Sequence, residues 1–465
     1  MANWPTRAYW NAFTLWHARR ERELPFEPLE KIREVQSRRV RSMVTHAYAT
    51  VPYYRQVMDA AGWQPRDFQT ADDLAKLPLL TSDQVLRNSV QFRSLSYPAS
   101  ECVTLLSGGS TGMAKHIAYD RAALFLSLAH GQRQRHVLAQ FVGQHLGYRE
   151  MTVERVGGDS TIIRQFYETN SWVPRRFDYA RALLPTMISL DEGIARINAF
   201  KPDVLRGYGS MIGYLFRRAH EQNSPIHLPK AVVYGADSIT QADRELIEKE
   251  FGVPVLSSYQ ATEALRIGYQ CERRAGFHLS LDQIAIRVVD PAGNSVRPGE
   301  SGEIAISNLT NRAMVLLNYQ IGDAVTLSAA GCRCGRTFPT IETISPSSSD
   351  RIVLADGRVV RGILLPILAV AGTIQVQLIQ DELNRFTLRV VYEPTEDWER
   401  VRQELDTVLR QILRQDSILD IVAVDTIPPE RNGKVKAVIS KVLHPDPQDD
   451  AAAHVRRSGR LESIR

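Results

Sequence analysis

Leu106-Ser-Gly-Gly-Ser-Thr-Gly-Met-Ala-Lys115 begins at the end of the apolar run 102–106 and is the most informative stretch of the chain. Its glycines let the backbone turn its amides inward, and the Ser and Thr hydroxyls add further donors. Such a loop after a strand can hold phosphate oxygens, with Lys115 as a nearby cation. It is not a Walker A loop, because Gly112 is followed by Met113 instead of Lys. Taken alone, it could also be a plain turn.

Short apolar runs alternate with helix-like stretches on both sides of this loop. The apolar runs are 102–106, 204–205, 231–234 and 254–259, and helical periodicity marks 211–222 and 241–251. Alternating strands and helices predict an α/β body. Two further runs, 284–289 and 302–306, are joined by a turn-rich segment and predict a hairpin.

A break in the pattern falls at Ser345-Pro-Ser-Ser-Ser349, which is small, polar and without period. We interpret it as a joint between domains. Beyond it, a compact α+β unit is predicted from strands and one charged helix, near 373–380, 384–392, 396–414 and 419–425. We therefore expect a large N-terminal α/β domain with several sheets (1–345), a small mobile α+β domain (346–442) and a disordered tail (443–465).

Composition excludes several classes of protein. Of the 465 residues, 44% are hydrophobic and 23% charged, as in globular proteins. The net charge is only +5 and no dense basic stripe is visible, which argues against a nucleic-acid partner. Four cysteines are too few for a secreted disulfide framework. Since no apolar run approaches about 20 residues, and the N-terminus lacks the features of a signal peptide, we expect a cytoplasmic protein without a transmembrane segment.

Residues 4–50 are predicted to form helices that carry many aromatic side chains, among them Trp4, Tyr9, Trp10, Phe13 and Trp16. Amphipathic helices packed on a core are the first interpretation. Adsorption to a membrane surface is the alternative, because apolar and basic residues alternate here.

Three later segments are informative because of the order in which they follow the Gly/Ser loop. They are Ser258-Tyr-Gln-Ala-Thr-Glu-Ala264, Asn318-Tyr-Gln-Ile-Gly-Asp-Ala324 and Pro428-Pro-Glu-Arg-Asn-Gly-Lys-Val-Lys436. Taken singly, each is compatible with an ordinary turn or a solvated loop. Together with the Gly/Ser loop, they resemble the adenylate-forming superfamily of acyl-CoA synthetases, luciferase-like enzymes and peptide-synthetase adenylation domains.

The resemblance is closest to the phenylacetate–CoA ligase branch and related capsule-biosynthesis proteins. Segments typical of that branch are Val51-Pro-Tyr-Tyr-Arg55, Leu77-Pro-Leu-Leu-Thr81 and Gly331-Cys-Arg-Cys-Gly-Arg-Thr337. The similarity extends from about residue 30 to about 442, nearly the whole chain.

This resemblance implies a role for each matching residue. The β- and γ-phosphates of ATP would be wrapped by the Gly/Ser loop, namely Ser107, Gly108, Gly109, Ser110, Thr111, Gly112 and Lys115. The adenine pocket would be lined by Gly235, Ala236 and Asp237, with Tyr259 stacked on the base. Thr262 would bind the α-phosphate or the carboxylate, Glu263 would hold Mg²⁺ and Asp323 would accept the ribose hydroxyls. Lys434 would reach in from the small domain as the catalytic cation.

The chain also departs from the family pattern. Met113 and Ala114 stand where Lys and Pro are common, and the joint has lost an Arg and one Asp, keeping only Asp350. Arg351 is close enough in sequence to compensate for the lost Arg. These departures put nucleotide affinity and the hinge in doubt.

The function that the resemblance implies is ATP-dependent activation of a carboxylic acid, with aryl acids as a candidate class, to an acyl-adenylate with release of pyrophosphate. The acyl group would then pass to coenzyme A, a carrier protein or an amine. Candidates for lining the acid pocket stand at strand ends, namely Tyr208, Gly209, Ser210, Tyr234 and Ser258. A homodimer is possible. The alternative is a catalytically impaired nucleotide-binding or scaffold relative of the same fold.

Three thiols and an imidazole form two clusters, Cys271 with His278 and Cys332 with Cys334. This inventory suits a structural Zn²⁺ site, and related ligases of the branch carry similar Cys/His pairs. The spacing is not that of a zinc ribbon, so reduced, half-buried cysteines are the alternative. Cys102 precedes the Gly/Ser loop and is expected in the core.

Overall fold

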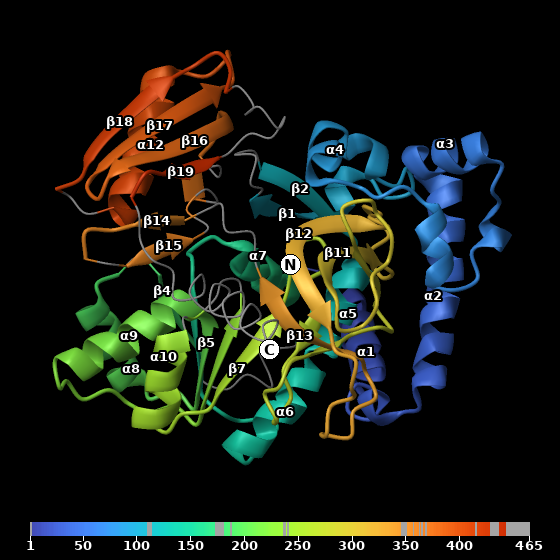
Figure 1. Ribbon diagram of the computed structural model, residues 1–465, viewed down its shortest axis with the longest axis horizontal. Coiled ribbons are helices and arrows are strands. Elements are labelled where there is room, and N and C mark those ends of the chain that lie inside the picture. Colours follow the sequence, from blue (N-terminus) through green and yellow to red (C-terminus); the bar gives the residue numbers. More distant parts are fainter. Residues whose placement is uncertain are drawn as a thin grey trace, which may run out of the picture.

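The computed structural model describes residues 2–108, 114–172, 181–186, 188–235, 239, 241–345, 351–356, 358–361, 363, 366–367, 370–413, 416–427 and 437–442. Figure 1 shows a large body and, above it, a smaller unit built from the C-terminal part of the chain. Of the predicted joint at 345–349, Ser345 is the last residue of a strand, whereas residues 346–349 and the predicted tail at 443–465 lie outside the described residues.

Helices make up the N-terminal part. They are α1 (Trp4–Ala18), η1 (Leu24–Phe26), α2 (Leu29–Thr50), α3 (Pro52–Ala61), η2 (Pro65–Asp67), η3 (Asp72–Lys76), α4 (Ser82–Arg87), η4 (Ser89–Phe92) and η5 (Ala99–Glu101). The Asn3 side chain caps α1 by accepting from the amide of Thr6. Pro52 separates α2 from α3, because proline fits the first turn of a helix but not its interior.

Helix α1 has apolar side chains on two sides. On the inner side, the Trp10 ring stacks on Phe125, with 4.7 Å between the centroids. On the outer side, Trp4, Tyr9 and Trp16 are 70%, 60% and 68% exposed. The expected packing on the core is present, and so is the exposed aromatic surface that the membrane-surface alternative requires.

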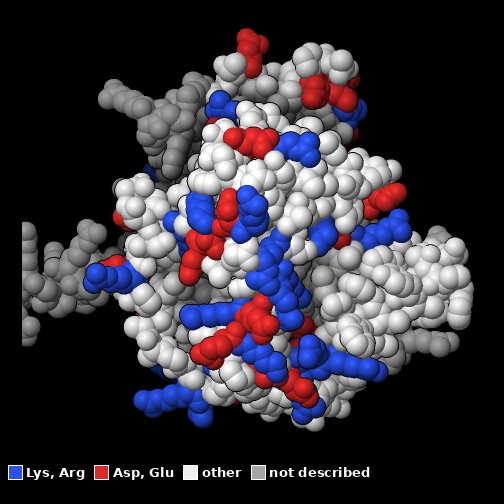
Figure 2. All heavy atoms as spheres, turned by 90° about the vertical axis from the view of Figure 1, so that its right-hand side faces the viewer, with Lys and Arg blue, Asp and Glu red and all other residues white. Residues whose placement is uncertain are grey.

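None of the helices in the described part of the chain combines the length and the apolar character of a membrane-spanning segment. Figure 2 views the face that carries α2 and α3, on the right in Figure 1. Lys and Arg side chains are interspersed there with Asp and Glu. This face therefore has no basic stripe of the kind that tracks a phosphate backbone.

The Gly/Ser loop connects two antiparallel strands, β1 (Val103–Gly108) and β2 (Ala114–Tyr119), with Ser107 opposite Lys115. Two helices follow, α5 (Arg121–His130) and α6 (Gln132–Val142). The Asp120 side chain caps α5 by accepting from the amide of Ala123.

The large body is organised by an eleven-stranded sheet in the order β10-β11-β12-β13-β9-β8-β7-β6-β5-β3-β4. Its parallel part comprises β3 (Glu150–Glu154), β4 (Arg181–Pro185), β5 (Val204–Tyr208), β6 (Ala231–Gly235) and β7 (Val255–Tyr259). Helices alternate with these strands, namely α7 (Asp159–Asn170), α8 (Leu190–Phe200), α9 (Gly209–Glu221), α10 (Gln241–Glu245) and the π-helix η6 (Leu246–Glu250). The predicted α/β body is confirmed.

The rest of this sheet is antiparallel: β8 (Gly268–Tyr269), β9 (Phe277–Leu279), β10 (Ile284–Val289), β11 (Ser301–Asn308), β12 (Tyr319–Leu327) and β13 (Thr340–Ser345). Strands β10 and β11 pair antiparallel from Ile284 with Asn308 to Val289 with Glu303, which confirms the predicted hairpin. On β5, Gly207 has a φ of 134°, and a Cβ there would lie 1.9 Å from the carbonyl oxygen of Val153, so only glycine fits.

The C-terminal unit has its own sheets and its own core. Strands β14 (Arg351–Val353) and β15 (Val359–Arg361) form a hairpin, and β16 (Thr373–Glu382), β17 (Arg385–Tyr392), β18 (Ile418–Ala423) and β19 (Val438–Ser440) form a sheet in the order β18-β17-β16-β19. Helix α12 (Trp398–Ile412) buries Val401, Leu405 and Leu409 in this core. The predicted small α+β unit is confirmed, and its exact boundaries stay a prediction.

Candidate active site

The two strands that flank the Gly/Ser loop meet the loop that follows β7. Ser107 Oγ donates a hydrogen bond of 2.9 Å to Glu263 Oε1, and Lys115 Nζ forms an ion pair of 2.8 Å with the same oxygen. Lys115 and Glu263 are both almost fully buried, at 6% and 4% exposure. Residues 148 positions apart thus form one charged cluster at the ends of strands.

Tyr319, the first residue of β12, completes this cluster. Lys115 Nζ donates to the Tyr319 hydroxyl at 2.5 Å, and the hydroxyl donates in turn to Glu263 Oε1 at 3.3 Å. Burial alone would raise the pKa of Glu263, but the Lys115 ammonium and hydrogen bonds from Lys115 and Ser107 hold that pKa below its ordinary value. The carboxylate is therefore ionised at neutral pH.

Thr262 is held by a residue that the sequence analysis did not single out. Its Oγ1 donates to Asp159 Oδ2 at 3.2 Å, and the amide of Leu106 donates to Asp159 Oδ1 at 3.1 Å. Asp159 starts α7 directly after a pair of glycines, and burial raises its pKa. An acidic residue in a glycine turn between β3 and α7 was a signal that could have identified it.

The residues expected to bind adenine and ribose also come together. The Tyr259 hydroxyl, at the end of β7, donates to Asp323 Oδ2 on β12 at 2.7 Å. Burial and the neighbouring Asp323 carboxylate raise the pKa of Tyr259, so the hydroxyl stays protonated and keeps donating.

The candidates for the acid pocket lie at adjacent ends of parallel strands. Tyr208 ends β5, Tyr234 is the last but one residue of β6, and Ser258 lies in β7. Gly209 and Ser210 open α9. Ser258 Oγ donates to the carbonyl oxygen of Tyr234 at 3.5 Å, and a Cβ at Gly235 would lie 2.9 Å from Ser258 Oγ.

Several predicted site residues lie outside the described part of the chain. These are Gly109, Ser110, Thr111 and Gly112 of the loop, Ala236 and Asp237 after β6, and Lys434 with its neighbour Lys436. Gly108 closes β1 opposite Ala114, whereas Arg351 is described only as the first residue of β14.

The Cys/His residues form one group in space. Cys271, His278, Cys332 and Cys334 place their ligand atoms within 4.8 Å of one another. The sulfurs of Cys271 and Cys332 are 3.8 Å apart, and Cys334 Sγ is 3.3 Å from His278 Nε2. With Zn–S bonds of about 2.3 Å, two sulfurs on a tetrahedral zinc lie about 3.8 Å apart, so this geometry fits the ion.

The imidazole in this group has the form that binds a metal. Burial, and then the nearby Arg336 guanidinium, lower the pKa of His278 to about 4, so the ring is neutral at pH 7. Its Nδ1 lies 3.3 Å from the carbonyl oxygen of Phe338, which leaves Nε2 directed at Cys334.

A second buried group, Glu21, His130 and Asp282, also has the residue types of a metal site. A guanidinium already lies between its carboxylates. Arg133 Nε donates to Glu21 Oε2 at 2.6 Å, and its two Nη atoms donate to Asp282 at 2.8 and 2.9 Å. This group is an ion-pair clamp between the segment after α1, helix α6 and the turn before β10.

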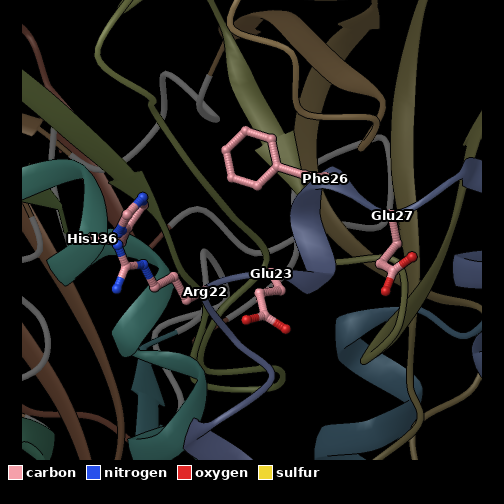
Figure 3. A pocket seen from close by; sticks show the side chains of 5 residues that line it. All are labelled: Arg22, Glu23, Phe26, Glu27 and His136. Atoms are coloured by element: carbon pink, nitrogen blue, oxygen red, sulfur yellow. The ribbon is translucent and has the colours of Figure 1, made fainter.

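A pocket of about 400 Å³ is lined by Arg22, Glu23, Phe26, Glu27 and His136, whose side chains Figure 3 shows. The Arg336 guanidinium lies 4.9 Å from the centre of the Phe26 ring, so the pocket adjoins the Cys/His group. None of the predicted nucleotide or acid residues lines it.

The sequence is similar to several known proteins. The family described as the CapK C-terminal domain matches residues 355–441. A phenylacetate–coenzyme A ligase from Thermus thermophilus is 28% identical over 349 residues, covering 71% of this chain and 74% of that protein. The Escherichia coli enzyme of the same name is 26% identical, with 70% and 73% covered. Protein CapK of Staphylococcus aureus is 21% identical, with 90% and 92% covered.

Among solved structures, 2-hydroxyisobutyryl-CoA ligase in complex with 2-HIB-AMP and CoA, in the thioesterification state, superposes with a TM-score of 0.62. The identity is 17%, and the alignment covers 95% of this chain and 94% of that chain. The postadenylation state of the same ligase gives a TM-score of 0.57 at 16% identity, with the same coverage. These relatives support the prediction of a ligase enzyme. The chain therefore has the fold of the adenylate-forming ligases and is a relative of the phenylacetate–CoA ligases and of CapK, as its motifs predicted.

Proposed function

We propose that the chain is a ligase that uses ATP to activate a carboxylic acid as an acyl-adenylate and then passes the acyl group to a thiol, such as that of coenzyme A, or to an amine. One observation carries this proposal: Ser107 and Lys115, on either side of the Gly/Ser loop, converge on Glu263 after β7. The relatives named above support the same class of reaction.

Mg²⁺ fits the oxygen atoms at this place. The ion prefers carboxylate and hydroxyl oxygens, and Glu263 offers a carboxylate next to the Thr262 hydroxyl. The contacts from Ser107, Lys115 and Tyr319 all fall on Oε1, so Oε2 is the atom that Glu263 would present. When bound, Mg²⁺ would screen the phosphate charges that repel an attacking carboxylate.

The other residues would bind and orient the nucleotide. The Tyr259 hydroxyl fixes one oxygen of Asp323, which orients that carboxylate toward the ribose hydroxyls. The Tyr259 ring would stack on adenine next to Gly235, whose missing Cβ leaves room for the Ser258 hydroxyl. Asp159 fixes the Thr262 hydroxyl, which would bind the α-phosphate or the carboxylate.

Lys115 has two roles in this proposal. Without nucleotide it neutralises Glu263, so the buried carboxylate has a partner. With nucleotide it would share its charge with the terminal phosphates held by the Gly/Ser loop. Lys434, on the small domain from 346 to 442, would supply the cation at the α-phosphate only when the two domains close.

One observation favours a second candidate, a nucleotide-binding relative without catalysis. The carboxylate assigned to magnesium is already engaged by an ammonium group, and the altered loop and joint point the same way. Calorimetry would then detect tight ATP binding, while hydroxylamine would trap no acyl-adenylate.

The proposal is tested by incubating the protein with ATP, Mg²⁺ and a panel of carboxylic acids, and by measuring pyrophosphate release. Release that depends on both the acid and ATP is expected. Folded protein that releases no pyrophosphate with any acid, yet binds ATP, would establish the second candidate instead.

We also propose that Cys271, His278, Cys332 and Cys334 hold a structural Zn²⁺, supported by the S–S distance of 3.8 Å between Cys271 and Cys332. Exhaustive chelation should lower the melting temperature, because zinc bound to the native state contributes folding free energy. Metal analysis that finds well under one equivalent of zinc in freshly purified protein would refute the site. A cytoplasmic location and a homodimer stay predictions.

A further inference from the structure

The turn that carries Glu263 also carries a cation that the proposed chemistry does not use, Arg266. The turn closes between β7 and β8 through hydrogen bonds from the amide of Leu265 to the carbonyl oxygen of Ala261 and from the amide of Ile267 to that of Tyr259. Leu265 adopts a φ of 59°, a conformation uncommon for a residue with a side chain. The direction in which Arg266 leaves the backbone is therefore imposed by the turn.

The Arg266 guanidinium lies against the junction of α5 and α6. Its Nε donates to the carbonyl oxygen of Ser127 at 2.9 Å. A Cβ at Gly131 would lie only 3.1 Å from Nη2, so the group lies over bare backbone that a larger residue would obstruct. Part of the residue nevertheless remains accessible.

No carboxylate in the described ranges forms an ion pair with Arg266. Its charged neighbours are other cations, Arg133, Arg135 and Arg206. Burial, and then these arginines, lower the pKa of Arg266 to about 10, although Tyr167 acts in the opposite direction. A single hydrogen bond to a carbonyl does not compensate a desolvated charge.

Two of these three arginines have carboxylate partners, whereas Arg135 lies over the Tyr148 ring at 5.9 Å. Arg133 is bound by Glu21 and Asp282, and Arg206 lies 3.3 Å from Glu150. Among the described residues, the four arginines of this region are thus paired with three carboxylates, and positive charge is in excess.

Two elements connect Arg266 with the reacting centre. Helix α7 binds Thr262 through Asp159, and its Tyr167 lies near Arg266. Tyr167 follows Asp159 by eight residues, which is about 12 Å along a helix axis. Strand β5 carries Arg206 two positions before Tyr208, one of the predicted acid-pocket residues. Arg266 is thus connected, through neighbouring residues, both with Thr262 and with a candidate residue of the acid pocket.

We propose that Arg266 binds a second carboxylate at the distal end of the acid, so that the enzyme prefers dicarboxylic over monocarboxylic acids. This inference rests on the proposed ligase function. In the described part of the chain only Nε of this guanidinium has a hydrogen-bond acceptor, and a guanidinium can bind a carboxylate with two parallel hydrogen bonds. Binding the substrate would supply an anionic partner that none of the described residues provides.

The test compares α,ω-dicarboxylic acids of increasing length with monocarboxylic acids of equal length, in pyrophosphate release by the full chain. Wild-type protein should have the higher kcat/KM with one of the dicarboxylic acids. Arg266→Met should lower this kcat/KM by about 10- to 100-fold and leave that of the matched monocarboxylic acid within about threefold. Arg266→Lys should recover part of the loss, and the exposed Arg273→Met serves as the control.

Thermal unfolding gives a readout that does not depend on catalysis. The preferred dicarboxylic acid should raise the melting temperature of the wild type but not that of Arg266→Met. Without acid, Arg266→Met should melt at the same or a higher temperature, because it removes a partly buried charge that has no carboxylate partner in the described ranges.

The outcomes separate this inference from the ligase proposal. If monocarboxylic acids are activated as well as dicarboxylic acids, and Arg266→Met changes neither, the inference is overturned while the ligase function stands. If no acid releases pyrophosphate, the ligase proposal fails, and the melting shifts still decide whether Arg266 binds dicarboxylates. A variant Arg266→Met that does not fold, with Arg266→Lys folded and equally active on both kinds of acid, would also overturn the inference.

Discussion

The clusters around Glu263 and around Arg133 contain the same chemistry in different surroundings. Each joins a buried cation to a buried carboxylate at 2.8 Å or less. Arg133 donates three N–H hydrogen bonds to two carboxylates that come from separate segments of the large body. Lys115 comes instead from the strand after the Gly/Ser loop, and Glu263 comes from a turn at the end of a parallel strand.

The difference shows that an ion pair by itself does not identify a site. Arg133 joins elements that also share a hydrophobic cluster containing Leu24, Leu138 and Leu281, which is a structural role. The Glu263 cluster lies at strand ends, where open α/β sheets bind their ligands. Damage to the Glu263 cluster should therefore reduce activity, whereas damage to the Arg133 cluster should reduce stability.

The largest effect is expected from Glu263→Gln, which removes the charge and keeps the shape of the side chain. Acyl-adenylate formation should fall by at least about 10²–10³-fold, with the circular dichroism spectrum unchanged. Activity within about threefold of the wild type would show that Glu263 does not hold the magnesium.

Lys434→Ala tests the cation proposed to join the Glu263 cluster from the small domain. Acyl-adenylate formation should slow by about 10²-fold or more, because a preorganised donor at the α-phosphate is lost. Transfer from chemically supplied acyl-adenylate should change little.

Lys436→Ala is the matched control for Lys434→Ala, since both lysines lie in the same loop. If Lys436 proves sensitive and Lys434 silent, the assignment of the motif is off by two positions. Equal loss in both half-reactions would mean that the loop is structural and that the domains do not alternate.

Arg133→Met should show the opposite pattern. It leaves Glu21 and Asp282 buried without their partner, which typically costs about 3–5 kcal/mol of stability. Chemical denaturation measures this loss, and the activity of the protein that remains folded should stay near the wild-type value. An unchanged stability with a large loss of activity would reverse the two roles.

The smallest effect concerns the pH dependence of stability. Burial raises the pKa of Glu21 from 4.5 to about 7, although Arg133 opposes the shift. The folded state then binds this proton more tightly than the unfolded chain, so the contribution of Glu21 to stability is lost as the pH rises from 4.5 to 7. Glu21→Gln should remove this slope, of at most about 1.4 kcal/mol per pH unit. Equal slopes in melting curves of the two proteins would contradict the assignment.

Local patterns predicted what depends on local structure. We could predict the alternating strands and helices of the α/β body, the β10–β11 hairpin and α12. Their hydrophobic period and their length are visible over a few residues. The order of the motifs predicted that Tyr259, Thr262, Glu263 and Asp323 would share a site, and the structure brings their elements together.

Tertiary partners were not predictable in the same way. Lys115 was assigned to phosphates alone, and its pairing with Glu263 depends on a contact across 148 residues. Asp159, the Arg133 clamp and Arg266, which has no carboxylate partner in the described part of the chain, were missed for the same reason. A linear pattern does not state which charges meet in the folded chain. The exposed aromatic residues of α1 show the same limit for apolar side chains, because the sequence alone does not state whether an apolar residue is buried in the fold.

The most direct test of the account is isotope exchange between pyrophosphate and ATP, measured with and without the acid that the panel identifies. We predict exchange that requires the acid, is retained by the exposed control Arg273→Met and is lost in Glu263→Gln. Exchange that is absent in the wild type with every acid, or that Glu263→Gln sustains at the wild-type rate, would contradict the proposed reaction at this site.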